Sequence, residues 1–154
     1  MPDPLLHEAH PTSGYAAVIA DEGEAVWLYL TAAGPGIVAD CWLLNRGPAL
    51  PGADLRARAD AYRARGAPPP APAEALHARA VPRYPLLPAF ALRWNAAGTA
   101  VAATVDAAVL ALVQATERRG YHRDLAAAGP WGAPLTADVL RAAFGEGDTA
   151  ALDA

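Results

Sequence analysis

Short apolar runs separated by turn residues dominate the first third of the chain. Three such runs, at residues 15–20, 25–30 and 37–44, are rich in Val, Leu, Ile and aromatic residues, and the segments between them contain Gly, Asp or Pro. Runs of this length with these boundaries are typical of consecutive antiparallel hairpins. We therefore predict a three-stranded meander in this part of the chain.

A second set of three runs follows later in the chain. Residues 88–94, 99–105 and 108–115 are mainly apolar, and turn segments at 95–98 and 106–107 separate them. The pattern predicts a second three-stranded meander. The two sets are either an internal repeat or two hairpin pairs that look alike because hairpins share the same turn chemistry.

Two of the predicted strands differ in the character of their faces. Residues 26–30 carry apolar side chains at both odd and even positions, so both faces are apolar and the strand is expected in the centre of a sheet. In residues 90–94 the large apolar side chains Phe90, Leu92 and Trp94 share one face. This strand is therefore expected nearer an edge.

Helical periodicity occurs in two segments. Residues 54–65 repeat apolar positions at helical spacing, with Asp54 as the expected N-cap and Gly66 as the stop. Near the end of the sequence, Thr136 is the expected cap of a helix that runs to Phe144. Both segments are predicted to place one apolar face against a sheet.

Together these elements favour an α+β fold: a mainly antiparallel sheet of about six strands in two three-stranded meanders, with two or three short helices packed on it. Residues 14–145 are expected to form a single α+β domain. Its Pro-rich linker at 66–73 can form neither a helix nor a central strand, and a short helical turn is expected at 74–80. We expect a flexible N-terminal arm at 1–13 and a frayed C-terminal tail at 146–154.

Composition narrows the chemistry. The 154 residues carry a net charge of −4, and all 12 basic residues are Arg, a bias that indicates a GC-rich bacterial genome. Without lysine the chain has no P-loop lysine, no Schiff-base lysine and no kinase-type lysine. Ser13 lies in the expected arm and Cys41 in an apolar run, so neither is expected to act as a nucleophile.

Cysteine usage and hydropathy point to a compartment. One cysteine cannot form an internal disulfide, which agrees with a reducing environment. The longest wholly apolar run, at 107–113, is too short to span a membrane, and the first residues lack the pattern of a secretory signal. We therefore expect a cytoplasmic protein with no membrane contact.

Several motifs recur in an order that is known from a bacterial family. They are Asp21-Glu22-Gly23-Glu24-Ala25 before Trp27-Leu28-Tyr29, Ile37-Val38-Ala39-Asp40 before Asn45, Arg93-Trp94-Asn95-Ala96-Ala97-Gly98, and Arg119-Gly120-Tyr121-His122-Arg123. In these motifs the chain resembles the family called domain of unknown function 2251, although its turn at 95–98 replaces an expected Asp-Gly turn. The resemblance implies no activity and no catalytic residues.

The densest polar chemistry follows the sixth apolar run. Three guanidiniums, a phenol and an imidazole lie close together in the sequence: Arg118, Arg119, Tyr121, His122 and Arg123. Guanidinium groups bind phosphate or carboxylate bidentately, so Arg119 and Arg123 could clamp an anion while Tyr121 stacks or donates. The alternative is a solvated turn whose Arg groups pair with nearby acids.

Other acidic residues have two interpretations each. Asp40 stands alone in an apolar run, so it should pair with a cation such as Arg93 or mark a site. The acids at 21–24 could hold a cation or face a basic partner, but acidic hairpin tips also favour solubility. The histidines do not converge and no Gly-rich phosphate loop opens a helix, so we expect no metal and no cofactor.

Three functional classes remain. The first is a non-enzymatic protein that binds a partner protein through a sheet face or edge strand, as an immunity protein or antitoxin does, because Trp and Tyr are favoured at interfaces. The second is a small enzyme or an anion-ligand sensor that uses Asp40, Tyr121 and His122 with the Arg cluster. RNA binding is the third, and the negative charge disfavours it. A homodimer is an open alternative.

Overall fold

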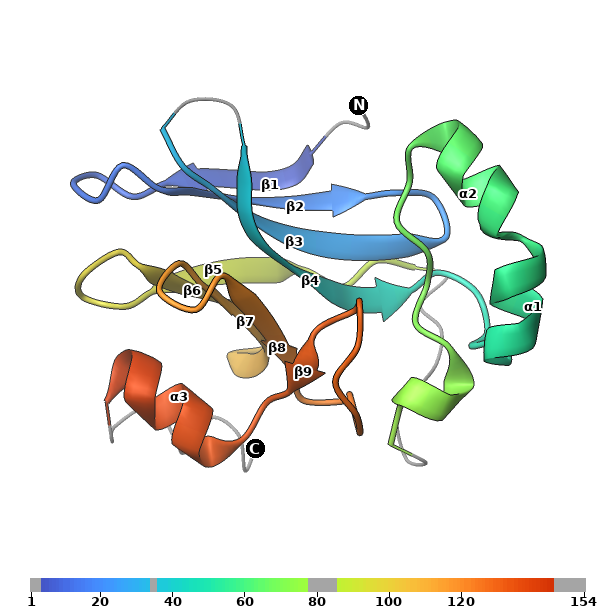
Figure 1. The fold of residues 1–154 in the computed structure, drawn as a ribbon. Helices are drawn as coiled ribbons and strands as arrows, with labels where there is room; N and C mark the ends of the chain where they lie inside the picture. The colour runs from blue at the N-terminus through green and yellow to red at the C-terminus, as the bar shows by residue number, and fades with distance from the viewer. Residues whose placement is uncertain (1–3, 34–35, 78–85, 146–154) are drawn as a thin grey trace.

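The computed structural model describes residues 4–33, 36–77 and 86–145, which form two stacked β-sheets with helices around them (Figure 1). The first sheet is antiparallel and has the order β1-β2-β3-β4. Its strands are β1 (Pro4–Ala9), β2 (Ala16–Asp21), β3 (Ala25–Thr31) and β4 (Ile37–Asn45). It contains the first predicted meander, with β1 added at its edge.

The second sheet has the order β5-β6-β7-β8-β9. Its strands are β5 (Phe90–Trp94), β6 (Ala100–Val105), β7 (Ala108–Gln114), β8 (Arg119–His122) and β9 (Ala133–Pro134). The first four run antiparallel to their neighbours, and β9 runs parallel to β8. All six predicted strands are present, but the predicted layout is only partly right because the two meanders lie in different sheets.

The inner faces of the two sheets share one apolar core. The first sheet contributes Val26, Leu28 and Leu30 from β3, and the second contributes Val101 from β6 and Val113 from β7. The alternation of side chains along a strand sends every second residue to this inner face. The apolar character of both faces of residues 26–30 predicts an interior strand, and β3 lies inside its sheet. The single apolar face of residues 90–94 predicts a strand near an edge, and β5 is an edge strand.

The sheets approach each other closely where β4 lies beside β8. A Cβ atom on Gly120 would lie 2.1 Å from the carbonyl oxygen of Asp40, so only glycine fits at this position. The backbone N–H of Trp42 donates to the carbonyl oxygen of Trp131 over 2.9 Å, which ties β4 to the loop before β9. These contacts fix β8 against the first sheet.

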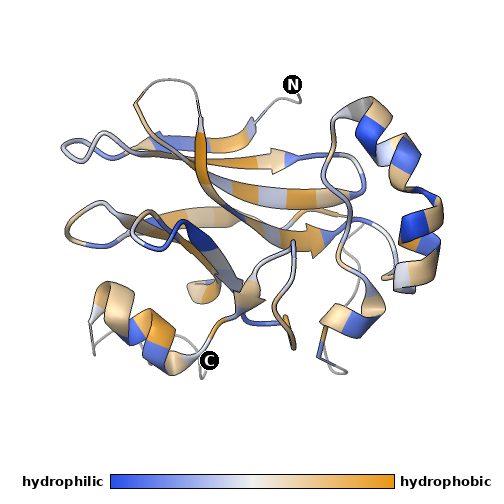
Figure 2. Ribbon diagram, in the orientation of Figure 1, coloured by the Kyte–Doolittle hydropathy of each residue, from blue (hydrophilic) through white to orange (hydrophobic). Residues whose placement is uncertain are grey.

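The helices cover different parts of the two sheets. The pair α1 (Gly52–Ala57) and α2 (Ala59–Arg65) lies beside the first sheet, whereas α3 (Ala137–Phe144) lies against the second sheet, on the side away from the first (Figure 1). A short 3-10 helix, η1 (Ala73–Ala75), follows the Pro-rich segment. In Figure 2 the strands are largely hydrophobic, while α1 and α2 carry several hydrophilic residues.

Three strands were not predicted. β1 occupies residues that we expected in the N-terminal arm at 1–13, and five of its six residues are exposed, so no alternation of apolar residues marks it. It forms because its backbone pairs with β2. β8 and β9 have only four and two residues, too few to show a strand pattern.

The predicted helices are confirmed with changes. The segment at 54–65 is divided at Arg58, whose φ of −98° and ψ of 1° interrupt the helix, and Pro51, not Asp54, occupies the N-cap. The hydroxyl of Thr136 caps α3 as expected and accepts a hydrogen bond from the backbone N–H of Val139. Of the turn predicted at 74–80, η1 covers the start. Residues 78–80, and the tail at 146–154, lie outside the described residues.

Candidate functional site

Strand β8 separates the predicted anion-binding residues onto two faces. The Tyr121 side chain is buried on the outer face of the second sheet, with Leu112 and Ala133, and its hydroxyl donates to the Glu117 carboxylate. Burial and this hydrogen bond raise the pKa of Tyr121. The ring is therefore covered by the chain's own residues, and the neighbouring His122 points to the opposite face.

His122 is part of the joint between the two sheets. Its side chain has no exposed surface; Nε2 lies 2.7 Å from the Leu43 carbonyl oxygen, and Nδ1 accepts a hydrogen bond from the Asp124 backbone N–H over 2.9 Å. Because the Leu43 oxygen can only accept, the proton belongs on Nε2. Burial lowers the pKa of His122 to about 3, so the ring is neutral and structural.

The remaining members of the predicted cluster are exposed and dispersed. The Arg118, Arg119 and Arg123 side chains face solvent, and Arg123 Nε lies 3.8 Å from the Asp124 carboxylate. The Asp40 side chain lies on the outer face of the first sheet, and partial burial raises its pKa. In the described chain it forms no ion pair with Arg93, whose guanidinium lies on the α3 side, 5.9 Å from the Phe144 ring.

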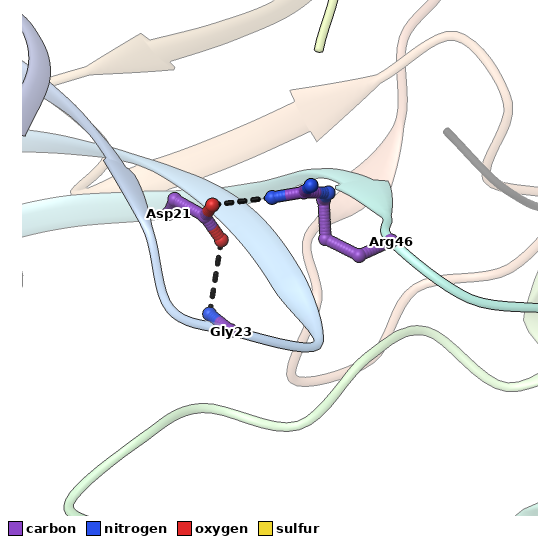
Figure 3. Close-up of polar contacts among 3 residues, drawn as sticks. All are labelled: Asp21, Gly23 and Arg46. Carbon is purple, nitrogen blue, oxygen red and sulfur yellow. Dashed lines mark hydrogen bonds and ion pairs between the residues drawn. The ribbon is translucent and has the colours of Figure 1, made fainter. Parts of the chain in front are cut away.

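The acids of the first hairpin have partners within the protein. One oxygen of the Asp21 carboxylate accepts a hydrogen bond from the Gly23 backbone N–H over 3.0 Å, and the other pairs with Arg46 (Figure 3). The Glu22 carboxylate accepts from the Tyr29 hydroxyl over 2.8 Å. These acids stabilise the turn and its neighbours, which supports a structural role over a cation site.

A well-formed cavity lies between the helix pair and the Pro-rich segment. Its volume is about 650 Å³. The helix pair contributes a stripe of residues at helical spacing, and the other wall comes from the Pro-rich segment, η1 and Trp131. The main lining residues are Leu55, Arg56, Ala59, Tyr62, Arg63, Ala67, Pro69, Pro72, Glu74, Ala75 and Trp131. We call this cavity the helix–proline groove.

Asn45, at the end of β4, anchors the Pro-rich wall of the groove. Its Oδ1 accepts from the Trp42 indole N–H (2.8 Å) and from the Ala71 backbone N–H (2.9 Å), and its Nδ2 donates to the Ala71 carbonyl oxygen (3.0 Å). The Trp131 indole N–H donates to the Pro70 carbonyl oxygen over 3.0 Å. Side chains thus supply the hydrogen bonds that a segment rich in proline cannot make with a neighbouring strand.

Two carboxylates anchor the helical wall. Glu24, in the turn between β2 and β3, accepts a hydrogen bond from the Tyr62 hydroxyl and pairs with Arg58 at 2.6 Å. Both oxygens of Glu74 accept from the Gly52 backbone N–H, at 2.8 and 3.0 Å, and this hydrogen bond lowers the pKa of Glu74. Polar contacts from Glu24 and Glu74 thus hold the helix pair beside the Pro-rich segment, and the cavity lies between them.

A second cavity, of about 430 Å³, lies on the other side of Glu24 and Arg58. Arg46 also lines it. Arg58 pairs with Glu24, and Arg46 pairs with Asp21, so the charged groups around this cavity serve internal contacts. The helix–proline groove, whose lining is mainly apolar and aromatic, is the better candidate for a binding site.

The groove was not identified from the sequence. The sequence predicts one apolar helix face at 54–65 that packs on a sheet, whereas Leu55, Ala59 and Tyr62 of this face line the groove. The opposing Trp131 lies far along the chain, and its position depends on the contact with β4. The available signal was an amphipathic helix followed directly by a Pro-rich segment, two elements that cannot pair through their backbones.

Comparison with models of known families, with curated proteins and with solved structures found no match. The resemblance to domain of unknown function 2251 stays a prediction. In the described ranges, no three His, Cys, Asp or Glu side chains cluster as a metal site would require. A membrane crossing needs a long apolar helix, and the helices described here do not meet that requirement.

Proposed function

We propose that this chain is a non-enzymatic binding protein that holds a segment of a partner protein in the helix–proline groove. The observation that carries the proposal is the groove itself: an open, mainly apolar cavity of about 650 Å³ with the partly exposed indole of Trp131 in its wall. Trp and Tyr bury large areas with little loss of conformational entropy and are enriched where proteins bind one another.

The position of the aromatic residues favours the groove over the sheet faces. The outer face of the first sheet carries Trp27 and Trp42, which are each 3% exposed under the Pro-rich segment. The outer face of the second sheet is covered by α3. Trp131, in contrast, is partly exposed and lines the groove.

The cytoplasmic location and an immunity- or antitoxin-like role remain part of this proposal. An anion sensor at Arg118–Asp124 is less well supported, because His122 is fully buried and the Tyr121 hydroxyl donates to Glu117. General acid–base chemistry or anion binding would need these groups within reach of a ligand.

A groove-filling substitution tests the proposal. Ala59→Trp would place an indole in the groove, whereas Ala61→Trp would add the same side chain on an exposed part of α2 outside the lining. Displayed random peptides of about ten residues are selected on each protein. We expect enrichment on the wild type and on Ala61→Trp but not on Ala59→Trp. Equal enrichment on all three would contradict the proposal.

A further inference from the structure

We infer that the segment bound in the helix–proline groove is acidic and amphipathic: an extended chain that places apolar side chains against Trp131 and pairs carboxylates with Arg56 and Arg63. This inference rests on the proposed function and specifies the chemistry of its partner. It follows from the arrangement of charge along the groove.

The two guanidiniums lie on the same side of the groove. Arg56 and Arg63 both belong to the helical stripe that lines it. They stand on either side of the interruption at Arg58, with Arg56 in α1 and Arg63 in α2. An extended segment that lies along the helix pair therefore passes both cations.

Both guanidiniums are available to a ligand. Within the described ranges no carboxylate lies at ion-pair distance from Arg56. Arg63 pairs with Asp60 one turn away on α2, and the two side chains are 73% and 93% exposed. An ion pair this exposed contributes about 1 kcal/mol or less, so a ligand carboxylate can replace Asp60.

The other charged groups near the groove are already engaged. Arg58 pairs with Glu24 behind the helices, and Glu74 accepts two hydrogen bonds from the Gly52 backbone N–H. The groove of a protein with net charge −4 thus has two guanidiniums and one carboxylate, Glu74, in its lining. Glu74 interacts with Arg56 through space, and Asp60 is weakly held by Arg63, so the lining keeps a positive excess. This local charge is complementary to an acidic segment and disfavours a basic one.

The floor of the groove defines the apolar part of the ligand. Leu55, Pro69, Pro72 and Ala75 provide aliphatic surface, and Trp131 adds an aromatic surface. A volume of about 650 Å³ lies within the usual range for sites that hold a few side chains or a small ligand. It accommodates apolar anchors from an extended chain better than a whole helix.

The experiment extends the peptide selection with charge variants. Peptides selected on the wild type are synthesised with their Glu and Asp residues intact and with these residues changed to Gln and Asn, and their dissociation constants are measured by fluorescence anisotropy at low and high salt. Arg56→Gln and Arg63→Gln are compared with Arg141→Gln, which removes an Arg of the same kind, paired with Asp138 one turn away on α3.

We expect the selected peptides to carry two acidic residues around an apolar anchor. Each groove variant should weaken the acidic peptide about three- to tenfold, with little effect on the Gln/Asn peptide, and Arg141→Gln should change neither. High salt should reduce the difference between the two peptides. Equal binding of both peptides to wild type and variants would overturn the inference and leave the proposed function standing. Equal enrichment of peptides on the wild type and on Ala59→Trp would contradict both this inference and the proposed function.

Discussion

The outer faces of the two sheets are covered in different ways. Over the second sheet, α3 places Leu140 between β6 and β7, and the gap beside Leu140 and Phe144 has no room for a water molecule. Over the first sheet, the cover is an irregular Pro-rich segment with Trp131, held by hydrogen bonds to Asn45 and to the Pro70 carbonyl oxygen.

The difference shows how a binding surface can arise from a covering layer. A helix satisfies its own backbone and can close a sheet face with side chains alone. A Pro-rich chain lacks donors, so polar side chains must fix it, and its second side stays open to other elements. In this protein the helix pair α1–α2 stands on that open side, and the helix–proline groove lies between them.

Removal of the buried side chain of α3 should have the largest effect on stability. Leu140 is 1% exposed, and Leu140→Ala should lower the free energy of unfolding by about 3 kcal/mol, since it removes buried apolar surface and leaves a cavity. Urea unfolding measures this change. Peptide binding at the groove should be unaffected in the folded fraction; a loss of binding would show that the two covers are coupled.

Loss of the polar anchor should affect both stability and the groove. Asn45→Ala leaves the Trp42 indole N–H and the Ala71 backbone N–H without their acceptor, so we expect a loss of about 2 kcal/mol. Asn95→Ala is the control: its Oδ1 also accepts two backbone hydrogen bonds, but at a partly buried turn where water can replace it.

Asn45→Ala should also weaken peptide binding and change the fluorescence of Trp131, because Pro70 and Ala71 lose their anchor. Asn95→Ala should do neither. If Asn45→Ala bound peptide with wild-type affinity, the anchor would not be needed for the groove.

Elements with local patterns could be predicted, and elements fixed by distant contacts could not. The strands at 25–30 and 99–105 and the cap of α3 follow from alternation and from Thr136, so the sequence determines them locally. β1 shows no such pattern, because its backbone pairing with β2 holds it in place. The groove depends on Trp131 and on the hydrogen bond that ties its loop, before β9, to β4, which a single sequence does not reveal.

His122, which lies between the two sheets, should make the free energy of unfolding depend on pH. The folded-state pKa of His122 is about 3, against 6.5 for an unperturbed imidazole, because burial and the nearby Arg123 disfavour the charged form. Between these values the unfolded chain binds a proton that the folded chain does not. The free energy of unfolding should therefore be highest above about pH 6.5 and fall by about 1.4 kcal/mol per pH unit as the pH decreases towards 3.

Denaturant unfolding at several pH values measures this slope. The glutamine of His122→Gln does not titrate. The free energy of unfolding of this variant should therefore lack the slope that His122 causes between pH 6.5 and 3, even if the variant is less stable at every pH. A slope equal to that of the wild type would contradict the role of His122.

The smallest effect is expected at an indole that makes no hydrogen bond. In the described chain the buried Trp27 Nε1 has no partner, so Trp27→Phe removes a donor that gains nothing in the folded state. We expect a change in the free energy of unfolding within about 1 kcal/mol, because removal of the unpaired buried donor partly offsets the loss of apolar volume. Trp42→Phe is the matched change and should be worse, because its indole N–H donates to Asn45.

The central claim, that the groove over the first sheet is the binding site, is tested most directly by the indole N–H signals in an NMR titration with a peptide selected on the wild type. Trp131 lines the groove, whereas the Trp94 indole donates to Glu8 where β5 lies beside β1. The Trp131 signal should shift in proportion to peptide bound while the Trp94 signal stays in place. A shift of Trp94 with no change at Trp131 would contradict the account.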